Sequence, residues 1–308
     1  MNGLLIINKP SGISSASAVA KVKHLLRQQN KESNISDNSY KVGHMGTLDP
    51  MASGVLLVGV GKATRLFDLF LSHNKRYIAE FIFGHTTDTL DITGQIVQNT
   101  SVIPNIQQII DVLPSLCGVV SQMPPQFSAK SVNGVKAYKI ARTGGSIDLQ
   151  PKNVHIHNIQ YLSQTDINTH SFTINCSSGT YIRSICRDLA NALGSFATMS
   201  RLQRIKCGNY TLQEAINIDS QFLVQNSLIP LSKILQDYEF LSIIDIPDKY
   251  FDKLKNGVKI STQDIIFQAI QQPFALYCKG QLFGIASIID GKIVLTTNLF
   301  TSSLDEYD

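Results

Sequence analysis

The sequence predicts an α+β protein with a mixed, mainly antiparallel central sheet flanked by helices, and a small β-rich domain at its C-terminal end. Segments that alternate like strands are interspersed with segments that have helical spacing. From about Asp245 the texture changes to short strands broken by repeated glycines. With 308 residues, 43% of them hydrophobic and 16% charged, the chain can form one large core and a smaller one.

The chain is expected to begin with a strand and a helix. Gly3 to Asn8 is a short apolar run typical of a buried strand. Ser14 to Arg27 repeats apolar residues at helical spacing, with Ser14 or Ser15 as its N-cap. The polar stretch from Gln28 to Tyr40 is rich in Asn and Ser and is expected to be a loop.

A second strand and helix are expected next. Gly54 to Val60 is apolar throughout and indicates a buried strand, which leads into a helix at about Ala63 to Leu71. Arg76 to Gly84 alternates aromatic or small residues with others, so we expect a strand that has Tyr77 near its start.

The remaining elements complete the sheet and its cover. Helices are expected at about Ile106 to Leu113 and Ser184 to Leu193, the second ended by Gly194. Lys152 to Leu162 and Ser171 to Cys176 are expected to be neighbouring strands.

Composition narrows the class of protein. The five cysteines form no CxxC pair, which argues against a disulfide framework or a zinc ribbon and favours a reducing cytosol. The N-terminal apolar run is interrupted by Lys9-Pro10, and no segment approaches the ~20 apolar residues of a membrane span. We therefore expect a cytoplasmic protein without a membrane partner.

The formal charge of +4 permits a nucleic-acid partner without requiring one, because counterion release depends on the local density of Lys and Arg. Two groups of basic residues are candidates for such contacts. They are Lys130, Lys136, Lys139 and Arg142, and then Arg201, Arg204 and Lys206. On charge alone, a solvated surface explains both groups better.

The most informative segment is Gly43-His-Met-Gly-Thr-Leu-Asp49-Pro-Met-Ala-Ser-Gly-Val-Leu56. Its glycines permit turns and close ligand approach, and Pro50 fixes φ directly after the acid. Asp49 is therefore expected to be held in a defined position. The same residue types also form ordinary turns, and composition alone favours that interpretation.

This segment resembles the catalytic loop of the TruB family, the tRNA pseudouridine-55 synthases. Further segments resemble the same family in the same order, and five ordered motifs are far more specific than one. They are Gly3 to Ser15, Lys75-Arg-Tyr77 with Thr87 to Gly94, Pro124 to Arg142, and Ser178-Gly-Thr-Tyr181-Ile-Arg183-Ser.

The resemblance implies an isomerase that converts a uridine in the T-loop of tRNA, at position 55, to pseudouridine. This reaction breaks the N1–C1′ bond, rotates the freed uracil and joins C5 to C1′. All atoms are retained, so no cofactor, metal or nucleotide is expected. Asp49 is the expected nucleophile, and attack on C1′, attack on C6 and a glycal route all stay open. The base must first flip out of its stack.

Three residues are expected to serve Asp49. Burial beneath a base disfavours an ionised carboxylate, and the fork of Arg183 suits paired hydrogen bonds that keep it charged. Asp91 resembles a family residue that orients this arginine, although Asp88 and Asp91 would also suit turn caps. Tyr77 is expected to stack on the uracil. Removal of the C5 proton by the Tyr77 hydroxyl is the alternative. Stacking is preferred because an unperturbed phenol is a weak base at neutral pH.

The resemblance also implies a set of residues that bind the RNA. They are Lys9, Pro10, His44, Gly46, Thr47, Lys130, Arg142, Tyr181 and Leu202. Lys9 and Pro10 are expected to floor the pocket and Leu202 to cap it. His44 is expected beside the flipped nucleotide, and Tyr181 beside Tyr77. The alternatives are a structural role for the histidine and core packing for the tyrosines.

The chain departs from the family pattern at three places. Met45 stands where Thr is common, Ser131 where a second basic residue is frequent, and Thr198 where His is frequent. We expect Met45 to affect packing rather than chemistry. The effects of Ser131 and Thr198 on RNA contacts stay open.

The resemblance divides the chain into two parts. Residues 1–240 are expected to be the pseudouridine synthase catalytic domain, with an RNA-gripping insertion at about 121–151. Residues 241–308 are expected to be a PUA-like RNA-binding domain. The expected partner is tRNA, bound through its T-stem-loop, and a monomer is expected.

Two other motifs carry no site. Gly61-Lys62 lacks the leading glycine of a phosphate loop, and Ala63 stands where Ser or Thr would hold magnesium. His155 and His157 share one face of a strand, but no third metal ligand is in sight.

Two other functions stay open. A tRNA-folding chaperone without essential turnover would keep the RNA contacts, but would have no need of Asp49, Tyr77 and Arg183. A glycoside hydrolase would use Asp49 with Asp88 or Asp91 as acid and nucleophile. The absence of Trp gives poor support to a sugar platform.

Overall fold

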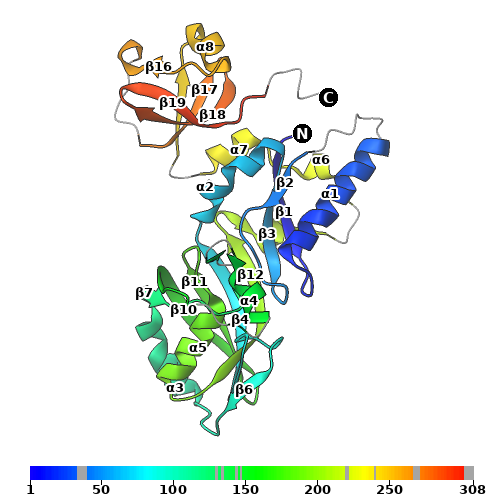
Figure 1. The fold of residues 1–308 in the computed structure, drawn as a ribbon, viewed down its shortest axis with the longest axis vertical. Coiled ribbons are helices and arrows are strands. Elements are labelled where there is room, and N and C mark those ends of the chain that lie inside the picture. The colour runs from blue at the N-terminus through cyan, green and yellow to red at the C-terminus, as the bar shows by residue number, and fades with distance from the viewer. Residues whose placement is uncertain are drawn as a thin grey trace.

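The computed structural model describes residues 1–32, 40–128, 131–132, 135–142, 145, 148–218, 222–238, 241–265 and 271–301. A ten-stranded sheet forms the body of the protein (Figure 1). Its strands are β1 (Gly3–Lys9), β2 (Val42–His44), β3 (Ser53–Val60), β4 (Lys75–Phe83), β7 (Gly118–Gln122), β10 (Lys152–Asp166), β11 (Thr169–Cys176), β12 (Ala197–Cys207), β13 (Tyr210–Thr211) and β14 (Ile216–Asn217).

The strand order is β14-β1-β3-β12-β4-β11-β10-β7, with β2 paired to β3 and β13 to β12. Only the β1–β14 and β3–β12 pairs of this sheet are parallel. The predicted α+β fold with a mixed, mainly antiparallel sheet is therefore confirmed.

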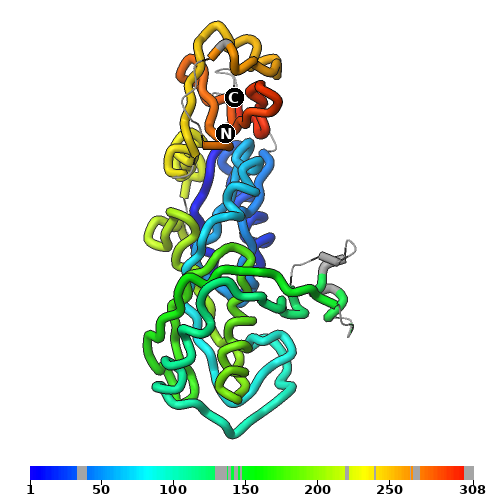
Figure 2. The backbone as a smooth tube through the Cα atoms, turned by 90° about the vertical axis from the view of Figure 1, so that its left-hand side faces the viewer, coloured from blue at the N-terminus to red at the C-terminus, as the bar shows by residue number. Residues whose placement is uncertain are grey.

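Helices and short ribbons surround the sheet. The helices of the body are α1 (Ser15–Glu32), η1 (Gly61–Leu66), α2 (Phe67–Leu71), α3 (Ile106–Val112), η2 (Leu113–Leu116), α4 (Ala137–Arg142), α5 (Ile182–Ala192), η3 (Leu212–Glu214), α6 (Val224–Ser227) and α7 (Leu231–Gln236). The ribbons are β5 (His85–Thr87) with β6 (Ile96–Asn99), and β8 (Ser131–Val132) with β9 (Val135–Lys136). The described parts of the segment between β7 and β10 project from the body as an arm (Figure 2).

Helix α1 is longer than the sequence predicted. Ser14 caps it, because its Oγ accepts from the backbone N–H of Ser17 at 3.0 Å. The helix continues to Glu32, so the predicted loop from Gln28 was wrong for residues 28–32, and residues 33–39 lie outside the described residues. The side-chain amide of Gln29 donates to Phe222 O at 2.7 Å and accepts from Val224 N at 3.0 Å. These tertiary contacts extend a helix whose end is polar.

The helix predicted after β3 is only partly α-helical. It starts as the 3₁₀ segment η1 and becomes α2 at Phe67. Ala63 and Leu66, three residues apart, are its buried positions, which is the spacing at which side chains align in a 3₁₀ helix.

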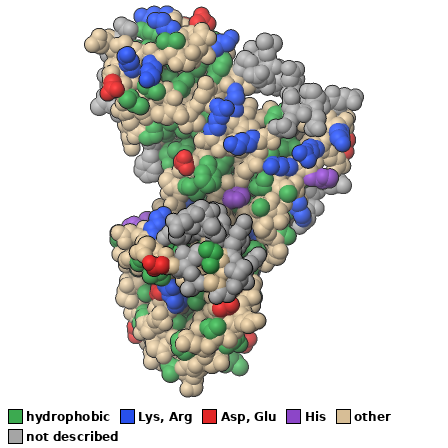
Figure 3. All heavy atoms as spheres, viewed as in Figure 1, with side chains coloured by type: hydrophobic (Ala, Val, Ile, Leu, Met, Phe, Trp, Pro, Cys, Tyr) green, Lys and Arg blue, Asp and Glu red, His purple; other side chains and the backbone are tan. Residues whose placement is uncertain are grey.

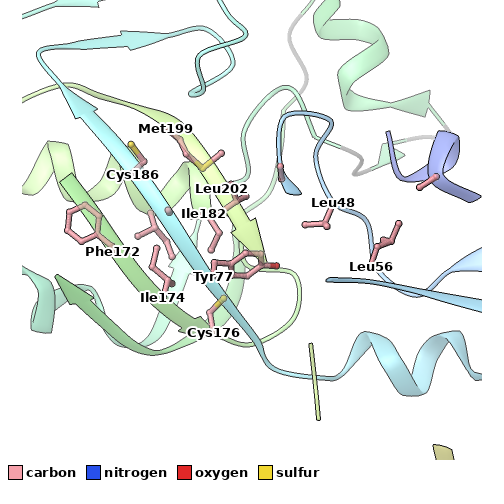
Figure 4. Packing of buried hydrophobic residues seen from close by; sticks show 14 of the residues in the cluster. Leu48, Leu56, Tyr77, Phe172, Ile174, Cys176, Ile182, Cys186, Met199 and Leu202 are labelled. Atoms are coloured by element: carbon pink, nitrogen blue, oxygen red, sulfur yellow. The ribbon is translucent and has the colours of Figure 1, made fainter. Parts of the chain in front are cut away.

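The predicted alternation of β4 is confirmed. Tyr77, Ala79, Phe81 and Phe83 are all buried on one face. The ring of Phe81 packs on that of Phe172 with centroids 5.0 Å apart. In Figure 4, Tyr77 and Leu202 project from neighbouring strands toward the segment that carries Leu48. The main core therefore extends to Leu48, the residue directly before Asp49.

The C-terminal part forms a separate five-stranded sheet in the order β15-β17-β18-β19-β16. Its elements are β15 (Ser242–Ile246), η4 (Asp248–Tyr250), α8 (Phe251–Lys255), β16 (Ile260–Ser261), η5 (Thr262–Asp264), β17 (Phe274–Cys278), β18 (Gln281–Ile289) and β19 (Lys292–Asn298). Ala275, Ile285 and Leu299 share a hydrophobic cluster with Leu4 and Leu57 of the body. The β-rich C-terminal part is thus confirmed, while the boundary at residue 240 and the PUA-like character stay predictions.

Candidate active site

Asp49 lies in the turn between β2 and β3, which we call the aspartate loop (residues 45–52). Ser15 Oγ donates to Leu48 O at 2.9 Å and accepts from Leu48 N at 2.8 Å. Pro50 O accepts from Gly12 N at 2.8 Å, and Met51 O accepts from Ser11 Oγ at 2.7 Å. The backbone on both sides of Asp49 is thereby fixed to the start of α1 and the segment before it.

The ammonium of Lys9 lies behind this loop and is fully buried. It donates to Pro10 O and Ile13 O, each at 2.8 Å, and to Pro50 O at 3.4 Å. Burial lowers the pKa of Lys9 to about 8; the charge of Asp49 opposes this shift and that of Arg204 adds to it. Lys9 thus joins a carbonyl of the loop, Pro50 O, to two carbonyls of the segment before α1, and it does not line the cleft described below.

Arg204 is the second cation behind the loop. Its guanidinium donates to Val55 O at 2.7 Å, Gly46 O at 3.2 Å and Thr47 O at 3.4 Å. Arg204 is only 1% exposed, so its assignment to a solvated basic surface was wrong. Gly54, at φ +103°, lies so close that a Cβ there would collide with the backbone oxygen of Arg204. The close packing of β12 and Arg204 against the aspartate loop therefore requires glycine at position 54.

A signal for the buried arginine was present in the sequence. Leu202 and Arg204 are two residues apart in β12, so they point to the same face of the sheet. They pair with Ala79 and Tyr77, which the alternation of β4 already assigned to the core. Applying the two-residue alternation of side chains to β12 would have placed Arg204 on the core face of the sheet.

Arg183, the second residue of α5, joins the aspartate loop to the β5–β6 ribbon. Its guanidinium is 5% exposed, with Nη2 2.9 Å from Asp49 Oδ2 and Nη1 3.5 Å from Asp91 Oδ2. The same two nitrogens donate to Phe127 O and Thr89 O, both at 3.0 Å. The fork is thus shared between two carbonyls and the two carboxylates that were expected as its partners, Asp49 and Asp91.

The two aspartates of the ribbon have different duties. Asp88 is a turn cap, since its Oδ1 accepts from Gln95 N at 2.9 Å. Asp91 caps the turn as well, through Oδ1, which accepts from Thr93 N at 3.0 Å and from Thr89 Oγ1 at 2.8 Å. Its other oxygen faces Arg183. Asp91 is 4% exposed and holds the arginine from behind.

Asp49 opens onto a cleft of about 530 Å³, a volume typical of small-ligand sites. Seven of the predicted site residues line it: Gly46, Thr47, Asp49, Tyr77, Tyr181, Arg183 and Leu202. The cations Lys75, Lys152 and Arg204 also line it, and Asp49 is the one acidic side chain among its described lining residues. Sequence reasoning did not identify Lys75 or Lys152 as lining residues.

Two tyrosines, Tyr77 and Tyr181, form part of the wall. Burial raises the pKa of Tyr77 to about 12, while the charge of Arg204 and a hydrogen bond with it act in the other direction. Its phenol therefore stays protonated at neutral pH. Burial also raises the pKa of Tyr181, whose backbone is held by both ends of the Gln122 amide at 2.8 and 3.1 Å.

The other predicted residues lie away from the cleft or outside what is described. Pro10 and His44 do not line it. His44 belongs to β2, and burial, helped by the charge of Arg204, lowers its pKa. Lys130 lies outside the described residues, and Arg142 is placed only as the last residue of α4.

Other residues singled out in the sequence also have defined places. Met45 is buried in the cluster that holds Leu57, and Thr198 Oγ1 donates to His85 O at 3.0 Å. The rings of His155 and His157 lie 4.2 Å apart. Within the described ranges, no three potential ligands group into a metal site, and no helix has the length and apolarity to cross a membrane.

Comparison with known sequences identifies relatives over most of the chain. The profile of the TruB family pseudouridylate synthases (N-terminal domain) matches residues 32–182. A tRNA pseudouridine synthase B from Clostridium kluyveri is 36% identical over 287 residues, covering 92% of this chain and 94% of its own. One from Clostridium acetobutylicum is 38% identical, with 86% and 88% covered.

Solved structures share the fold at lower identity. An H/ACA ribonucleoprotein bound to a substrate RNA containing 2′-deoxyuridine superposes with a TM-score of 0.68 at 20% identity, covering 98% of this chain and 86% of the other. A Cbf5–Nop10–Gar1 complex gives 0.65 at 22% identity, covering 96% and 79%. At this identity the likeness concerns the fold.

Replacing Arg204 should loosen the aspartate loop. In Arg204→Met, the carbonyls of Gly46 and Val55, whose hydrogen bonds with Arg204 are buried, lose this donor, and each unsatisfied acceptor costs ~1–3 kcal/mol. We expect the free energy of urea unfolding to fall by about 3 kcal/mol. Arg201→Met is the matched control, because this exposed arginine of the same strand forms only a surface ion pair with Glu80. Equal losses of unfolding free energy in the two variants would show that the hydrogen bonds from Arg204 do not stabilise the loop.

Lys9 should give stability a distinct pH dependence. Its folded pKa of about 8 lies below the unfolded 10.5, so between these values the unfolded chain binds more protons. The unfolding free energy of the parent, minus that of Lys9→Met, should therefore rise from about pH 8 to 10.5 and stay flat below that window. Urea unfolding at pH 6 to 10.5 measures this difference. A difference that falls with pH would mean that Lys9 is not destabilised by burial.

Proposed function

The chain belongs to the TruB family of pseudouridylate synthases and isomerises uridine in tRNA to pseudouridine, and we propose that it does so in the T-loop, at position 55, with Asp49 as the nucleophile. The single observation that carries this assignment is the Asp49–Arg183 pair at the cleft. Asp49 is 34% exposed, while its partner is buried at 5%. The carboxylate of Asp49 is thus accessible to a ligand, while the arginine that holds it stays buried.

The cleft suits one extruded pyrimidine nucleotide. A flipped uridine entering it would meet the ring of Tyr77 and the side chain of Leu202, which lie on neighbouring strands. Aromatic faces stack on bases without regard to sequence. The cations around Asp49 favour the approach of a polyanion. Base flipping would bring the target uridine out of its stack and into the cleft that Asp49 lines.

In the proposed reaction, an oxygen of Asp49 bonds to C1′ while the N1–C1′ bond breaks, and the electron pair goes to the uracil. The uracil turns within the cleft, and C5 bonds to C1′ as the Asp49–C1′ bond breaks and returns its electrons to the carboxylate. The proton on C5 then passes to water, and N1, which kept the electron pair of the broken bond, takes up a proton, so the composition of the nucleoside is unchanged. Attack on C6 and the glycal route use the same carboxylate, so the geometry serves all three.

Arg183 would hold the plane of Asp49 during this exchange, and Asp91 would hold Arg183. Tyr77 would serve by stacking, because a phenol with a pKa of about 12 is not a base at neutral pH. Lys9 would act through the loop rather than on the RNA, since its donors already bind carbonyls.

The surface supports an extended RNA contact. Lys and Arg side chains gather over α1 and the C-terminal domain on the face in Figure 3, where few acids interrupt them. Lys21, Lys23 and Arg27 are exposed on α1. This pattern suits the phosphates of a T-stem-loop. The C-terminal sheet would act as a PUA-like RNA-binding domain.

A glycoside hydrolase fits the geometry less well. Such an enzyme places a protonated acid and a nucleophile on opposite sides of the bond to be cleaved. Asp91 lies behind Arg183 and does not line the cleft, and Asp88 caps a turn. No observation favours a chaperone that lacks turnover.

Asp49 variants test the nucleophile. With purified protein and an unmodified tRNA transcript labelled with tritium at uridine C5, Asp49→Asn and Asp49→Ala should release no tritium, because neither side chain can form and break the ester bond. The affinity for tRNA should survive, since RNA contacts lie mostly elsewhere. Normal tritium release by either variant, or equal loss of binding and turnover, would contradict this assignment. Free uracil in the products would indicate a hydrolase.

Arg183→Lys tests the orientation of Asp49. An ammonium cannot bridge two carboxylates and two carbonyls with a fixed fork, so kcat should fall by about 100-fold. Arg187→Lys is the control, because Arg187 lies one turn further along α5 in a surface ion pair with Asp188 at 2.8 Å. We expect that variant to keep its rate. Normal turnover by Arg183→Lys would show that the shared guanidinium does not position the acid.

A further inference from the structure

A second cavity of about 530 Å³ lies where β4 begins and β11 and β12 end. It carries a particular chemistry: three cations and three amides line it, namely Lys75, Arg76, Lys206, Asn74, Asn175 and Asn209. No Asp or Glu is among its described lining residues. Lys75 lines this cavity and the cleft of Asp49 alike, so the two share a wall.

The sheet itself gathers these groups. Asn175 of β11 and Lys206 of β12 pair with Arg76 of β4 from its two sides. Residues paired across adjacent strands point to the same face, with Cβ atoms about 5 Å apart. The row of Asn175, Arg76 and Lys206 is therefore fixed by backbone pairing and does not depend on flexible loops.

A bulge in β12 selects the cation in this row. Arg204 pairs with Tyr77, and the next pair is Lys206 with Arg76, so Ile205 is the extra residue. Without the bulge, Ile205 would lie opposite Arg76 and Lys206 would move to the other face. Bulges often re-aim a side chain beside a functional site. Here Arg204 stays opposite Tyr77 under the aspartate loop, and the bulge after it directs Lys206 to the face of Arg76 and the cavity.

This arrangement costs stability. Like charges directly opposite on neighbouring strands repel each other. Arg76 is exposed and Lys206 half-buried, and neither has a carboxylate partner within the described part of the chain. Two cations side by side on one face of the sheet, near a third and with no acid among the described lining residues, suit the binding of an anion.

We propose that this cavity binds a backbone phosphate of the same RNA whose uridine enters the cleft of Asp49. The proposal rests on the proposed function for its choice of RNA. The guanidinium of Arg76 would grip two phosphate oxygens, Lys206 would add a point charge, and Asn175 would donate a hydrogen bond. A free phosphate ion has the same chemistry, but the shared wall with the cleft favours the RNA strand.

Binding to an inactive protein tests this proposal separately from catalysis. In an Asp49→Asn background, the Kd for an unmodified T-stem-loop hairpin is measured across a series of KCl concentrations. Arg76→Gln and Lys206→Gln should each raise Kd by about 3- to 10-fold. Each should also flatten the slope of log Kd against log salt by about 0.7–0.9, the change for one lost phosphate contact.

A neighbouring cation provides the control. Lys233 of α7 is paired with Asp237 at 2.7 Å and does not line the cavity, so Lys233→Gln should leave Kd and slope unchanged. Thermal unfolding separates a structural role from a binding role. Lys206→Gln relieves the repulsion, so its Tm should be equal to or above that of the parent. Unchanged Kd and salt slope in both variants would overturn the proposal, and a lower Tm of Lys206→Gln would then assign that residue a structural role.

A titration with inorganic phosphate distinguishes the source of the anion. If the two variants lose phosphate binding, followed by ³¹P line broadening, while the RNA Kd and salt slope stay unchanged, the cavity serves a free anion and the RNA assignment is wrong. Tritium release by the protein with Asp49 intact is read independently. Absence of tritium release would contradict the proposed function, whereas the salt slopes would still show whether the cavity binds an RNA phosphate.

Discussion

The site depends on one buried guanidinium that two carboxylates share. Arg183 lies in the first turn of α5, Asp49 lies between β2 and β3, and Asp91 lies between β5 and β6, so the two contacts join three distant parts of the chain. A buried charge that loses its partner is costly. The protein therefore keeps all three segments in place, and Asp49 is the one of the two acids left facing the cleft.

Two further buried cations explain why the aspartate loop holds its shape. Lys9 and Arg204 donate to its carbonyls from opposite ends, and neither forms an ion pair within the described residues. Desolvating them is expensive, and carbonyl dipoles repay only part of that cost. Their charges also surround Asp49 with positive potential. The same groups thus position the acid and favour the approach of an anionic ligand to it.

Much of the fold could be predicted, because period-two and period-3.6 patterns report burial directly. The alternation of β4 placed Tyr77 on the core face, and the glycines around Asp49 marked the loop. Burial of Arg204 was missed because a charged residue was taken as a surface residue, although its period with Leu202 indicated otherwise. The extension of α1 was missed because Gln29 is held by residues almost two hundred positions away.

Local sequence patterns predict neither how a buried side chain divides its contacts among its partners nor the register in which two strands pair. The division of the Arg183 fork between Asp49 and Asp91 follows from how α5 meets the ribbon. The direction of Lys206 follows from a single extra residue, Ile205, in the pairing of β12 with β4. A one-residue change in register moves a side chain to the other face of a sheet, and composition carries no record of such a change.

The most direct test is a crystal structure of the protein bound to a T-stem-loop in which the target uridine is replaced by 5-fluorouridine. Our account predicts that the extruded pyrimidine nucleotide lies between Tyr77 and Leu202, with an oxygen of Asp49 at or bonded to it and Arg183 still joining Asp49 to Asp91. A nucleotide that stays in its stack, or a bound base whose nearest acid is not Asp49, would contradict it.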